Sequence, residues 1–101
     1  MYYVYILRCE KNFLYTGITK NVERRFKEHC DGTGKGAKYT RSHKPLGVEA
    51  VWEAQTKSDA SRLEYRIKKL KKEEKEAIIL KPNEDFVLET AENECIFKRI
   101  L

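Results

Sequence analysis

The hydrophobic pattern of the first twenty residues predicts a β-hairpin. Residues 2–9 are mostly aromatic and β-branched with weak alternation, which is typical of a strand buried on both faces. A polar turn at 10–12 separates them from a second apolar stretch at 13–18. Gly17 inside this second stretch indicates a bulge or a group that approaches the backbone closely.

Helical spacing follows the hairpin. Asn21 is a good N-cap, and apolar residues recur with helical period over 22–30. The glycine-rich segment 31–36 cannot continue this helix and predicts a loop. Residues 37–43 are basic and predict a short second helix that ends before Pro45.

The second half of the chain predicts one more strand and two helices. An apolar stretch with a tryptophan, 48–54, predicts the strand. Ser58 is expected to cap a helix over 59–70, and another helix over 73–80 follows directly. For 83–101 the pattern allows edge strands, a short helix or a loose tail. The order strand, strand, helix, short helix, strand, helix, helix is an α+β pattern, with a small sheet covered by helices.

The charge of the chain is strongly basic outside its C-terminal part. The 101 residues fit one domain and carry 21 Lys and Arg against 16 Asp and Glu. Residues 1–81 hold 19 basic and 11 acidic residues (+8), whereas residues 82–101 hold two basic and five acidic residues (−3). A basic body suits a polyanion, nucleic acid first. A well-solvated surface explains the same charge equally well.

Cysteine usage and hydropathy exclude several classes of protein. The three cysteines are widely spaced, so neither a disulfide framework nor a CxxC zinc site is expected. The longest apolar run is only four residues, 77–80, which predicts neither a signal peptide nor a membrane span. We expect a cytoplasmic protein without a membrane partner.

Two tyrosines are placed to meet across the hairpin. Tyr5 and Tyr15 lie on the two predicted strands, and a turn with an odd number of residues, such as 10–12, puts both side chains on one face. A phenol can accept or donate a proton in catalysis. Tyrosines are also simply good strand residues, so both interpretations stay open.

The first helix directs two polar side chains along the border of its apolar face. Val22 and Phe26 form that face, Arg25 and His29 lie beside it, and Arg24 points to solvent. A guanidinium can bind phosphate, and a histidine can donate a hydrogen bond or a proton. The alternative is an ordinary surface arginine with a boundary histidine.

A carboxylate interrupts the apolar stripe of the long helix. Glu64 falls inside the stripe that is formed by Ala60, Leu63, Ile67 and Leu70. A carboxylate on a buried side is costly unless it is paired or bound to metal, and a hard divalent cation would suit it. Pairing with Lys68, one turn on, is the equally weighted alternative.

The segment 34–41 combines exposed backbone with positive charge. Its glycines expose N–H groups, and its charged and aromatic side chains are Lys35, Lys38, Tyr39 and Arg41. Such a segment could follow a phosphate backbone, although it lacks the spacing of a P-loop. A solvated basic loop explains it as well.

Together these features resemble the GIY-YIG nuclease domain over residues 2–80, most closely its small single-domain bacterial members without assigned function. Val-Tyr-Ile at 4–6 stands for the first triplet, and Tyr-Thr-Gly at 15–17 for the second. The segment 34–41 is similar to the GKGAKYTR loop of those members. Some members carry a lysine directly after the second glycine; this chain has Ile18 there, with Lys20 two residues further on.

The resemblance extends to three single residues. Arg25 matches the catalytic arginine of the family, His29 matches a helix position that carries His or Tyr, and Glu64 matches the metal-binding glutamate. The resemblance implies a three-stranded antiparallel sheet flanked by helices. It also implies phosphodiester hydrolysis with one divalent cation, usually Mg²⁺, in which a tyrosine phenolate activates water, Arg25 holds the phosphate and Glu64 holds the metal.

We therefore expect residues 1–81 to form a nuclease domain and residues 82–101 an acidic C-terminal extension. The expected activity is metal-dependent endonuclease cleavage of nucleic acid, first of all DNA, in a repair or recombination setting. The candidate nucleic-acid contacts are Lys20, Lys35, Lys38, Tyr39 and Arg41. A non-catalytic nucleic-acid-binding module is the alternative, and a module that binds an acidic protein is a third. A monomer or a weak homodimer is expected.

Overall fold

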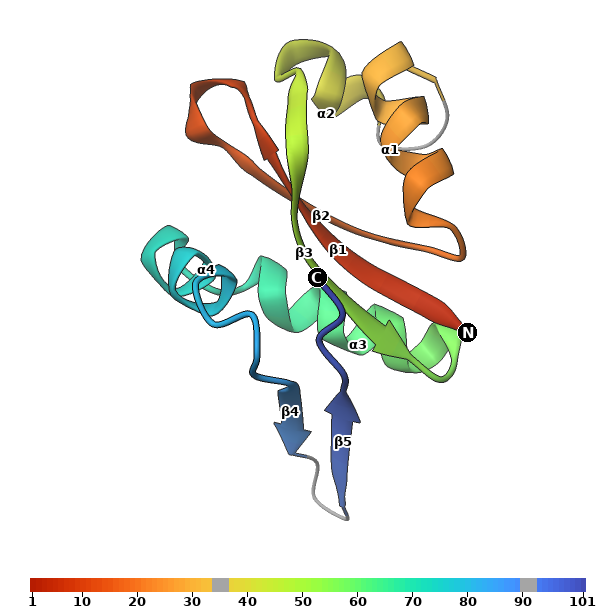
Figure 1. Cartoon of the computed structure of the whole chain (residues 1–101), viewed down its shortest axis with the longest axis vertical. Coiled ribbons are helices and arrows are strands. Elements are labelled where there is room, and N and C mark those ends of the chain that lie inside the picture. Colours follow the sequence, from red (N-terminus) through yellow and green to blue (C-terminus); the bar gives the residue numbers. More distant parts are fainter. Residues whose placement is uncertain (34–36, 90–92) are drawn as a thin grey trace.

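The computed structural model describes residues 1–33, 37–89 and 93–101, apart from the side chains of residues 37 and 38. A small sheet lies between two pairs of helices, and a β-hairpin extends from one end of the molecule (Figure 1). The α+β class is confirmed. No helix in the described ranges is long and apolar enough to cross a membrane.

The central sheet has three antiparallel strands. They are β1 (Tyr2–Cys9), β2 (Leu14–Thr19) and β3 (Pro45–Ala54), in the order β2-β1-β3. The central strand β1 is buried on both faces, as its weak alternation predicted. Strand β3 begins three residues earlier than predicted. Pro45 opens it opposite Cys9, because the first position of a strand tolerates a residue without an N–H group.

The hairpin turn sets the register between β1 and β2. The short turn η1 (Glu10–Asn12) has a left-handed backbone at Lys11 and Asn12, with φ of 61° and 64°. Three turn residues place Leu7 directly opposite Tyr15. Because Tyr5 lies two residues before Leu7, the Tyr5 and Tyr15 side chains share one face, as predicted.

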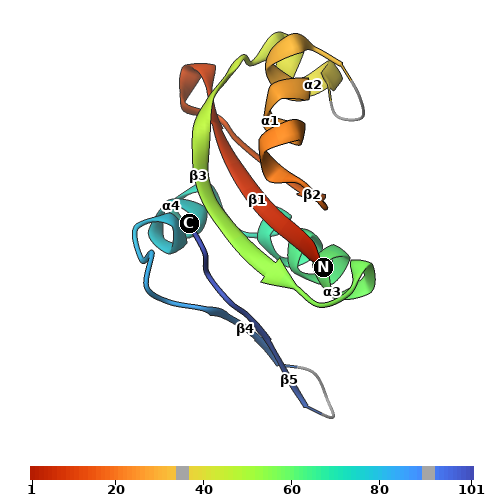
Figure 2. The same cartoon turned by 45° about the vertical axis from the view of Figure 1, so that its right-hand side comes forward.

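Helices α1 (Val22–Asp31) and α2 (Ala37–Ser42) cover that face of the sheet (Figure 2). The Asn21 side chain accepts a hydrogen bond from the Arg24 N–H at 3.1 Å, which confirms the predicted N-cap. Gly32 ends α1 with a φ of 72°, a conformation that favours glycine. Both ends of α1 are therefore set by its own sequence.

Helix α3 (Lys57–Lys68) packs on the opposite face of the sheet. The prediction of Ser58 as its N-cap is wrong: the Thr56 hydroxyl accepts the Asp59 N–H at 3.1 Å, so the helix begins at Lys57. Both hydroxyl residues suit an N-cap, so propensity alone did not distinguish them.

Helix α4 (Lys72–Ile79) follows after a short break, close to the predicted 73–80. The Lys71 N–H donates to the Glu74 carboxylate at 2.8 Å, which satisfies a backbone donor at the helix start. The Arg8 guanidinium binds both carboxylate oxygens of Glu76 at 2.6 Å, and so ties β1 to α4.

The C-terminal region forms strands, the first of the three alternatives left open for it. Strands β4 (Phe86–Glu89) and β5 (Glu94–Phe97) pair as a separate antiparallel hairpin. The residues after β5 return to the outer edge of β3 (Figure 2). The Glu53 N–H donates to the Lys98 carbonyl at 2.9 Å, and the Ile100 N–H donates to the Val51 carbonyl at 2.9 Å. The tail thus covers an edge that would otherwise expose unpaired backbone groups.

Arg99 anchors this tail. Its guanidinium is buried and donates to backbone carbonyls at the end of α4, among them Ile78 at 3.0 Å and Ile79 at 3.3 Å. It also donates to the Glu49 carbonyl at 3.2 Å and lies 5.0 Å from the Trp52 ring centroid. A cation is favourable at a helix C-terminus. The division of the chain at residue 81 stays a prediction, although the tail packs directly on β3.

Candidate functional site

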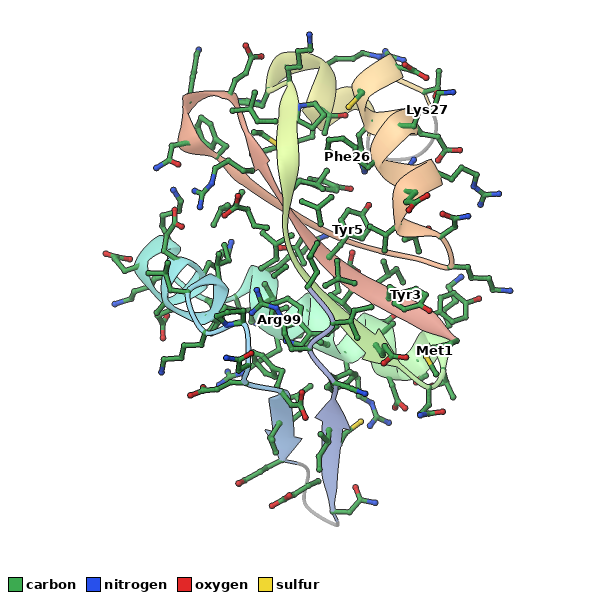
Figure 3. All side chains as sticks on the ribbon, viewed as in Figure 1. Met1, Tyr3, Tyr5, Phe26, Lys27 and Arg99 are labelled. Carbon is green, nitrogen blue, oxygen red and sulfur yellow. The ribbon has the colours of Figure 1, made fainter. Side chains whose placement is uncertain are left out.

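Gly17 allows the Tyr5 ring to lie across β2. The two residues are paired directly opposite each other, and a Cβ atom on Gly17 would come within 2.7 Å of Tyr5 Cζ and closer still to the hydroxyl oxygen. The close approach predicted at this glycine is confirmed. The Tyr5 side chain is 1% exposed. Figure 3 places it on the side of the sheet that faces α1, together with Phe26, whereas Arg99 lies near α4.

A buried chain of hydrogen bonds begins at Tyr5. Its hydroxyl lies 2.9 Å from His29 Nε2, and His29 Nδ1 lies 3.1 Å from Thr40 Oγ1. The three residues come from β1, α1 and α2 and are 1%, 1% and 3% exposed. The sequence did not indicate Thr40, because this contact depends on how two helices joined by a glycine-rich segment lie relative to each other.

Burial controls the protonation of two of these groups. It raises the pKa of Tyr5 above its ordinary value of 10.0; the Tyr15 charge adds to this effect, and Arg25 opposes it. Burial also lowers the pKa of His29 to about 4, and the positive charge of Arg25 acts in the same direction. His29 is therefore a neutral imidazole at neutral pH, with one donor and one acceptor nitrogen.

Arg25 lies next to Tyr5. The helical wheel placed Arg25 toward the sheet and Arg24 toward solvent; the Arg25 side chain is 12% exposed, whereas Arg24 is exposed. The positive charge of Arg25 acts on the Tyr5 hydroxyl and lowers its pKa, and the Arg25 guanidinium donates to Glu28 Oε1 at 3.0 Å. A partly exposed guanidinium in this position can still bind an incoming anion.

Tyr15 belongs to the same group of rings. Its ring centroid lies 6.4 Å from that of Tyr5, 4.9 Å from that of His29 and 5.3 Å from that of Tyr39. Tyr39 stacks on His43 at 4.9 Å on its other side. The ring of Tyr39 is thus engaged with protein neighbours, and its role as a nucleic-acid contact stays a prediction.

Glu64 approaches the site from the other side of the sheet. It lies on α3, which contacts β2 and β1, and its charge is close enough to raise the pKa of Tyr5. The Glu64 side chain is 24% exposed, and its carboxylate lies 3.4 Å from Lys68 Nζ. The ion pair given as the alternative is therefore present, and it leaves the carboxylate partly open to solvent.

The other basic candidates do not join this group. Lys20 is exposed, with its Nζ 5.2 Å from the Tyr2 ring centroid. Arg41 is exposed and donates to the Gly32 carbonyl at 3.1 Å. Lys35 lies outside the described residues, as does the side chain of Lys38. Their contacts with nucleic acid stay predictions.

The donor set around Glu64 fits one class of metal. Within the described ranges, no group of three or more His, Cys, Asp or Glu residues could hold a metal ion. Zinc usually needs three or four protein ligands, so these residues do not fit it. Mg²⁺ keeps several waters and is often bound by one or two carboxylates, so a single partly exposed Glu64 fits a hydrated hard cation.

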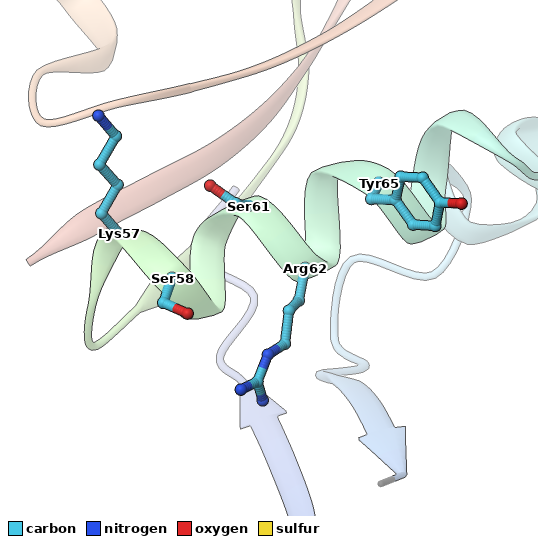
Figure 4. Close-up of a pocket in the computed structure, with 5 residues that line it drawn as sticks. All are labelled: Lys57, Ser58, Ser61, Arg62 and Tyr65. Carbon is cyan, nitrogen blue, oxygen red and sulfur yellow. The ribbon is translucent and has the colours of Figure 1, made fainter.

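An open hollow on α3 lies apart from this group. It has a volume of about 560 Å³ and is lined by Lys57, Ser58, Ser61, Arg62 and Tyr65. In Figure 4, Lys57 and Ser61 point toward the side of the helix where β1 and β2 are drawn, and Arg62 points away from them. None of the candidate catalytic residues lines it, so we do not place the site there.

The three free cysteines lie in different environments. Cys9 is buried on the α1 side of the sheet, Cys95 is half-buried on β5, and Cys30 is exposed on α1. Burial raises the pKa of the Cys9 and Cys95 thiols.

Comparisons with known proteins show the family of the chain. A family model described as the GIY-YIG catalytic domain matches residues 1–77. The chain is 48% identical over 82 residues to a UPF0213 protein of Fusobacterium nucleatum, covering 81% of this chain and 80% of the relative. It is 51% identical over 78 residues to a UPF0213 protein of Oceanobacillus iheyensis, with 77% and 88% covered.

A solved structure is similar as well. The solution NMR structure of a UPF0213 protein from Bacillus halodurans matches with a TM-score of 0.50 and 44% identity, covering 79% of this chain and 84% of that chain. The predicted three-stranded antiparallel sheet with flanking helices is thereby confirmed. The chain belongs to the GIY-YIG family, a nuclease superfamily, and is similar to its small UPF0213 proteins.

Proposed function

We propose that the chain is a metal-dependent endonuclease that hydrolyses phosphodiester bonds in nucleic acid, with DNA as the expected substrate. One observation supports this most: a phenol is hydrogen-bonded to an imidazole, and the charges of a guanidinium and a carboxylate act on that phenol. They belong to Tyr5, His29, Arg25 and Glu64. A phosphodiester transition state needs neutralised charge and an aligned water, which such groups can supply.

Arg25 holds the phosphate in this proposal. Its guanidinium presents a planar set of donors that matches two phosphate oxygens, and its positive charge offsets the charge that develops there. The ion pair with Glu28 orients the side chain on the border of α1. An incoming phosphate would compete with that carboxylate for the same donors.

A tyrosine oxygen orients the attacking water, and in its phenolate form it would take a proton from that water. Tyr5 and Tyr15 both lie within the cluster. Burial keeps Tyr5 a neutral phenol at neutral pH, so its oxygen first acts as a hydrogen-bond acceptor for water. Because a phenolate is the stronger base, we expect cleavage to increase with pH.

Glu64 would hold the divalent cation, for which we expect Mg²⁺. When bound, the cation would neutralise negative charge on the phosphate oxygens. The partial exposure of Glu64 leaves room for the water ligands that Mg²⁺ retains. A place in DNA repair or recombination, a cytoplasmic location and a monomeric or weakly dimeric state belong to the same proposal.

A cleavage assay with titrated Mg²⁺ tests the proposal on single-stranded, duplex and branched DNA and on RNA. We expect Glu64→Ala and Arg25→Ala each to lower the rate by at least about 100-fold. Arg24→Ala is the matched control on the same helix, and Glu73→Ala is a control carboxylate, since both residues are exposed. Equal cleavage by all four variants would identify a contaminating nuclease.

Binding without catalysis is the second candidate. The ion pair between Glu64 and Lys68 favours it, because Lys68 would compete with a cation for the carboxylate. This function predicts nucleic-acid binding that weakens steeply as salt rises, with no turnover at any Mg²⁺ concentration. Binding that is insensitive to salt would exclude it.

A further inference from the structure

We infer that Thr40 is a positioning residue that holds His29 in one tautomer, with the proton on Nδ1, so that Nε2 accepts a hydrogen bond from the Tyr5 hydroxyl. The inference deepens the proposed function and rests on it for its catalytic meaning. Tyr5 and His29 are candidates from the sequence, whereas Thr40 comes only from the packing of α2 against α1.

Both ring nitrogens of His29 have a partner inside the protein. Nε2 lies 2.9 Å from the Tyr5 oxygen, and Nδ1 lies 3.1 Å from Thr40 Oγ1. A neutral imidazole has one donor nitrogen and one acceptor nitrogen, so one partner must donate and the other must accept. All three side chains are at most 3% exposed, so bulk water has little access to them.

The neighbouring Arg25 favours one of the two tautomers, and Thr40 supplies the acceptor that this tautomer needs at Nδ1. A guanidinium only donates, and the positive charge of Arg25 acts on the Tyr5 hydroxyl. This charge favours a Tyr5 hydroxyl proton that points away from Arg25, and His29 Nε2 is the acceptor at hydrogen-bonding distance. With Nε2 as the acceptor, Nδ1 carries the ring proton and donates to the Thr40 hydroxyl oxygen.

This arrangement orients the Tyr5 oxygen. When its O–H bond points to His29, its lone pairs are directed away from that ring. In the proposed function, that is where the phosphate and the attacking water bind. His29 acts as a fixed acceptor, and Thr40 touches neither the substrate nor the reacting atoms.

The tautomer can be measured in the folded protein without any substrate. Long-range ¹H–¹⁵N correlation spectra of histidine-labelled protein at neutral pH distinguish protonated from unprotonated ring nitrogens, and His29→Gln identifies the His29 signals. We expect Nδ1 protonated and Nε2 unprotonated in the wild type. Thr40→Val removes the hydroxyl at similar volume and should shift the signals toward a mixture of tautomers, whereas Thr40→Ser should keep the wild-type pattern.

The cleavage rate gives the second readout. Thr40→Val should lower it by at least about tenfold, as loss of a group that orients a functional histidine commonly does, and Thr40→Ser should restore it. Thr33→Val, at an exposed threonine after α1, is the control. Amide spectra verify that each variant is folded.

Two results would overturn the inference: a proton on Nε2 in the wild type, or unchanged His29 signals in Thr40→Val. The tautomer decides the inference even if the wild-type protein cleaves no nucleic acid tested. In that case the nuclease proposal fails separately from the assignment of the hydrogen bonds.

Discussion

Gly17 is the residue on which the position of Tyr5 depends most directly. In Gly17→Ala the new methyl group would lie within 2.7 Å of Tyr5 Cζ, so the Tyr5 ring must move. We expect cleavage to fall at least about tenfold and the free energy of unfolding to fall by roughly 1–3 kcal/mol. Urea denaturation and the nicking assay measure the two effects.

Gly47 provides the matched control for this change. It lies on β3, and a Cβ atom there would meet nothing within 4 Å. Gly47→Ala should therefore leave cleavage unchanged and stability unchanged or slightly higher. If Gly17→Ala and Gly47→Ala cleaved equally well, the close approach of Tyr5 to Gly17 would not matter for cleavage.

His29 should make stability depend on pH. Its pKa is about 4 in the folded chain against an ordinary 6.5. Between these pH values, His29 therefore binds a proton in the unfolded chain but not in the folded chain. The contribution of His29 to the free energy of unfolding is complete above about pH 6.5. It is lost as the pH falls toward 4, and the loss is roughly 3 kcal/mol at most. Denaturation at several pH values in this window measures it.

Two histidine variants separate the contribution of His29 from that of carboxylates that titrate in the same pH range. His29→Gln should show a smaller decline between pH 6.5 and 4 than the wild type. His43→Gln keeps His29 in place and should show the full decline. Equal profiles for the wild type and His29→Gln would contradict the burial argument.

The limit of sequence reasoning is visible in single residues of the site. Strand alternation and helical period are local rules, and they placed Tyr5, Tyr15 and Arg25 correctly relative to the sheet. These rules did not indicate Thr40, because its partner His29 lies eleven residues away on another helix. The periodicity of α3 marked Glu64 as unusual, but only the packing of α3 against β2 shows that it approaches Tyr5.

At the scale of elements, the start of α3 depends on one hydroxyl group. The Thr56 side chain accepts the Asp59 N–H, whereas Ser58 lies inside the first turn and is exposed. Thr56→Ala should lower the free energy of unfolding by about 0.5–2 kcal/mol. Ser58→Ala should change it little, and urea denaturation of both variants checks the difference. A larger loss in Ser58→Ala would favour the start predicted from the sequence.

Element types were more predictable than element ends. Hydrophobic pattern identified the three strands of the central sheet and helices α1, α3 and α4, since each of these elements buries one face or both, whereas α2 was predicted from a basic segment that ends before Pro45. The start of β3 at Pro45 and the covering of its edge by the tail were not predictable, because both depend on pairing with distant residues. The acidic character of the tail gave no sign that Arg99 would be buried within it.

At the scale of the whole molecule, Arg99 joins the tail to the rest of the chain. Arg99→Leu removes the donors to Ile78, Ile79 and Glu49 and leaves those carbonyls without this partner. We expect a loss of roughly 2–4 kcal/mol, because several buried acceptors lose a charged donor together. Hydrogen exchange should show faster exchange at the amides that the tail protects.

Two amides report this release of the tail. The N–H groups of Val51 and Glu53 donate to the carbonyls of Leu101 and Lys98, so both should exchange faster in Arg99→Leu. Lys98→Ala keeps its backbone carbonyl and has an exposed side chain, so it should retain slow exchange. Unchanged protection in Arg99→Leu would show that backbone pairing alone holds the tail.

The environments of the three thiols give the chain a built-in attachment point. A maleimide reacts with an accessible thiolate, and burial both shields Cys9 and disfavours ionisation of Cys9 and Cys95. A fluorophore should therefore attach first at Cys30, on the exposed side of α1 and next in sequence to His29. Nucleic acid that docks at this helix would then change the emission of the dye, with no engineered cysteine required.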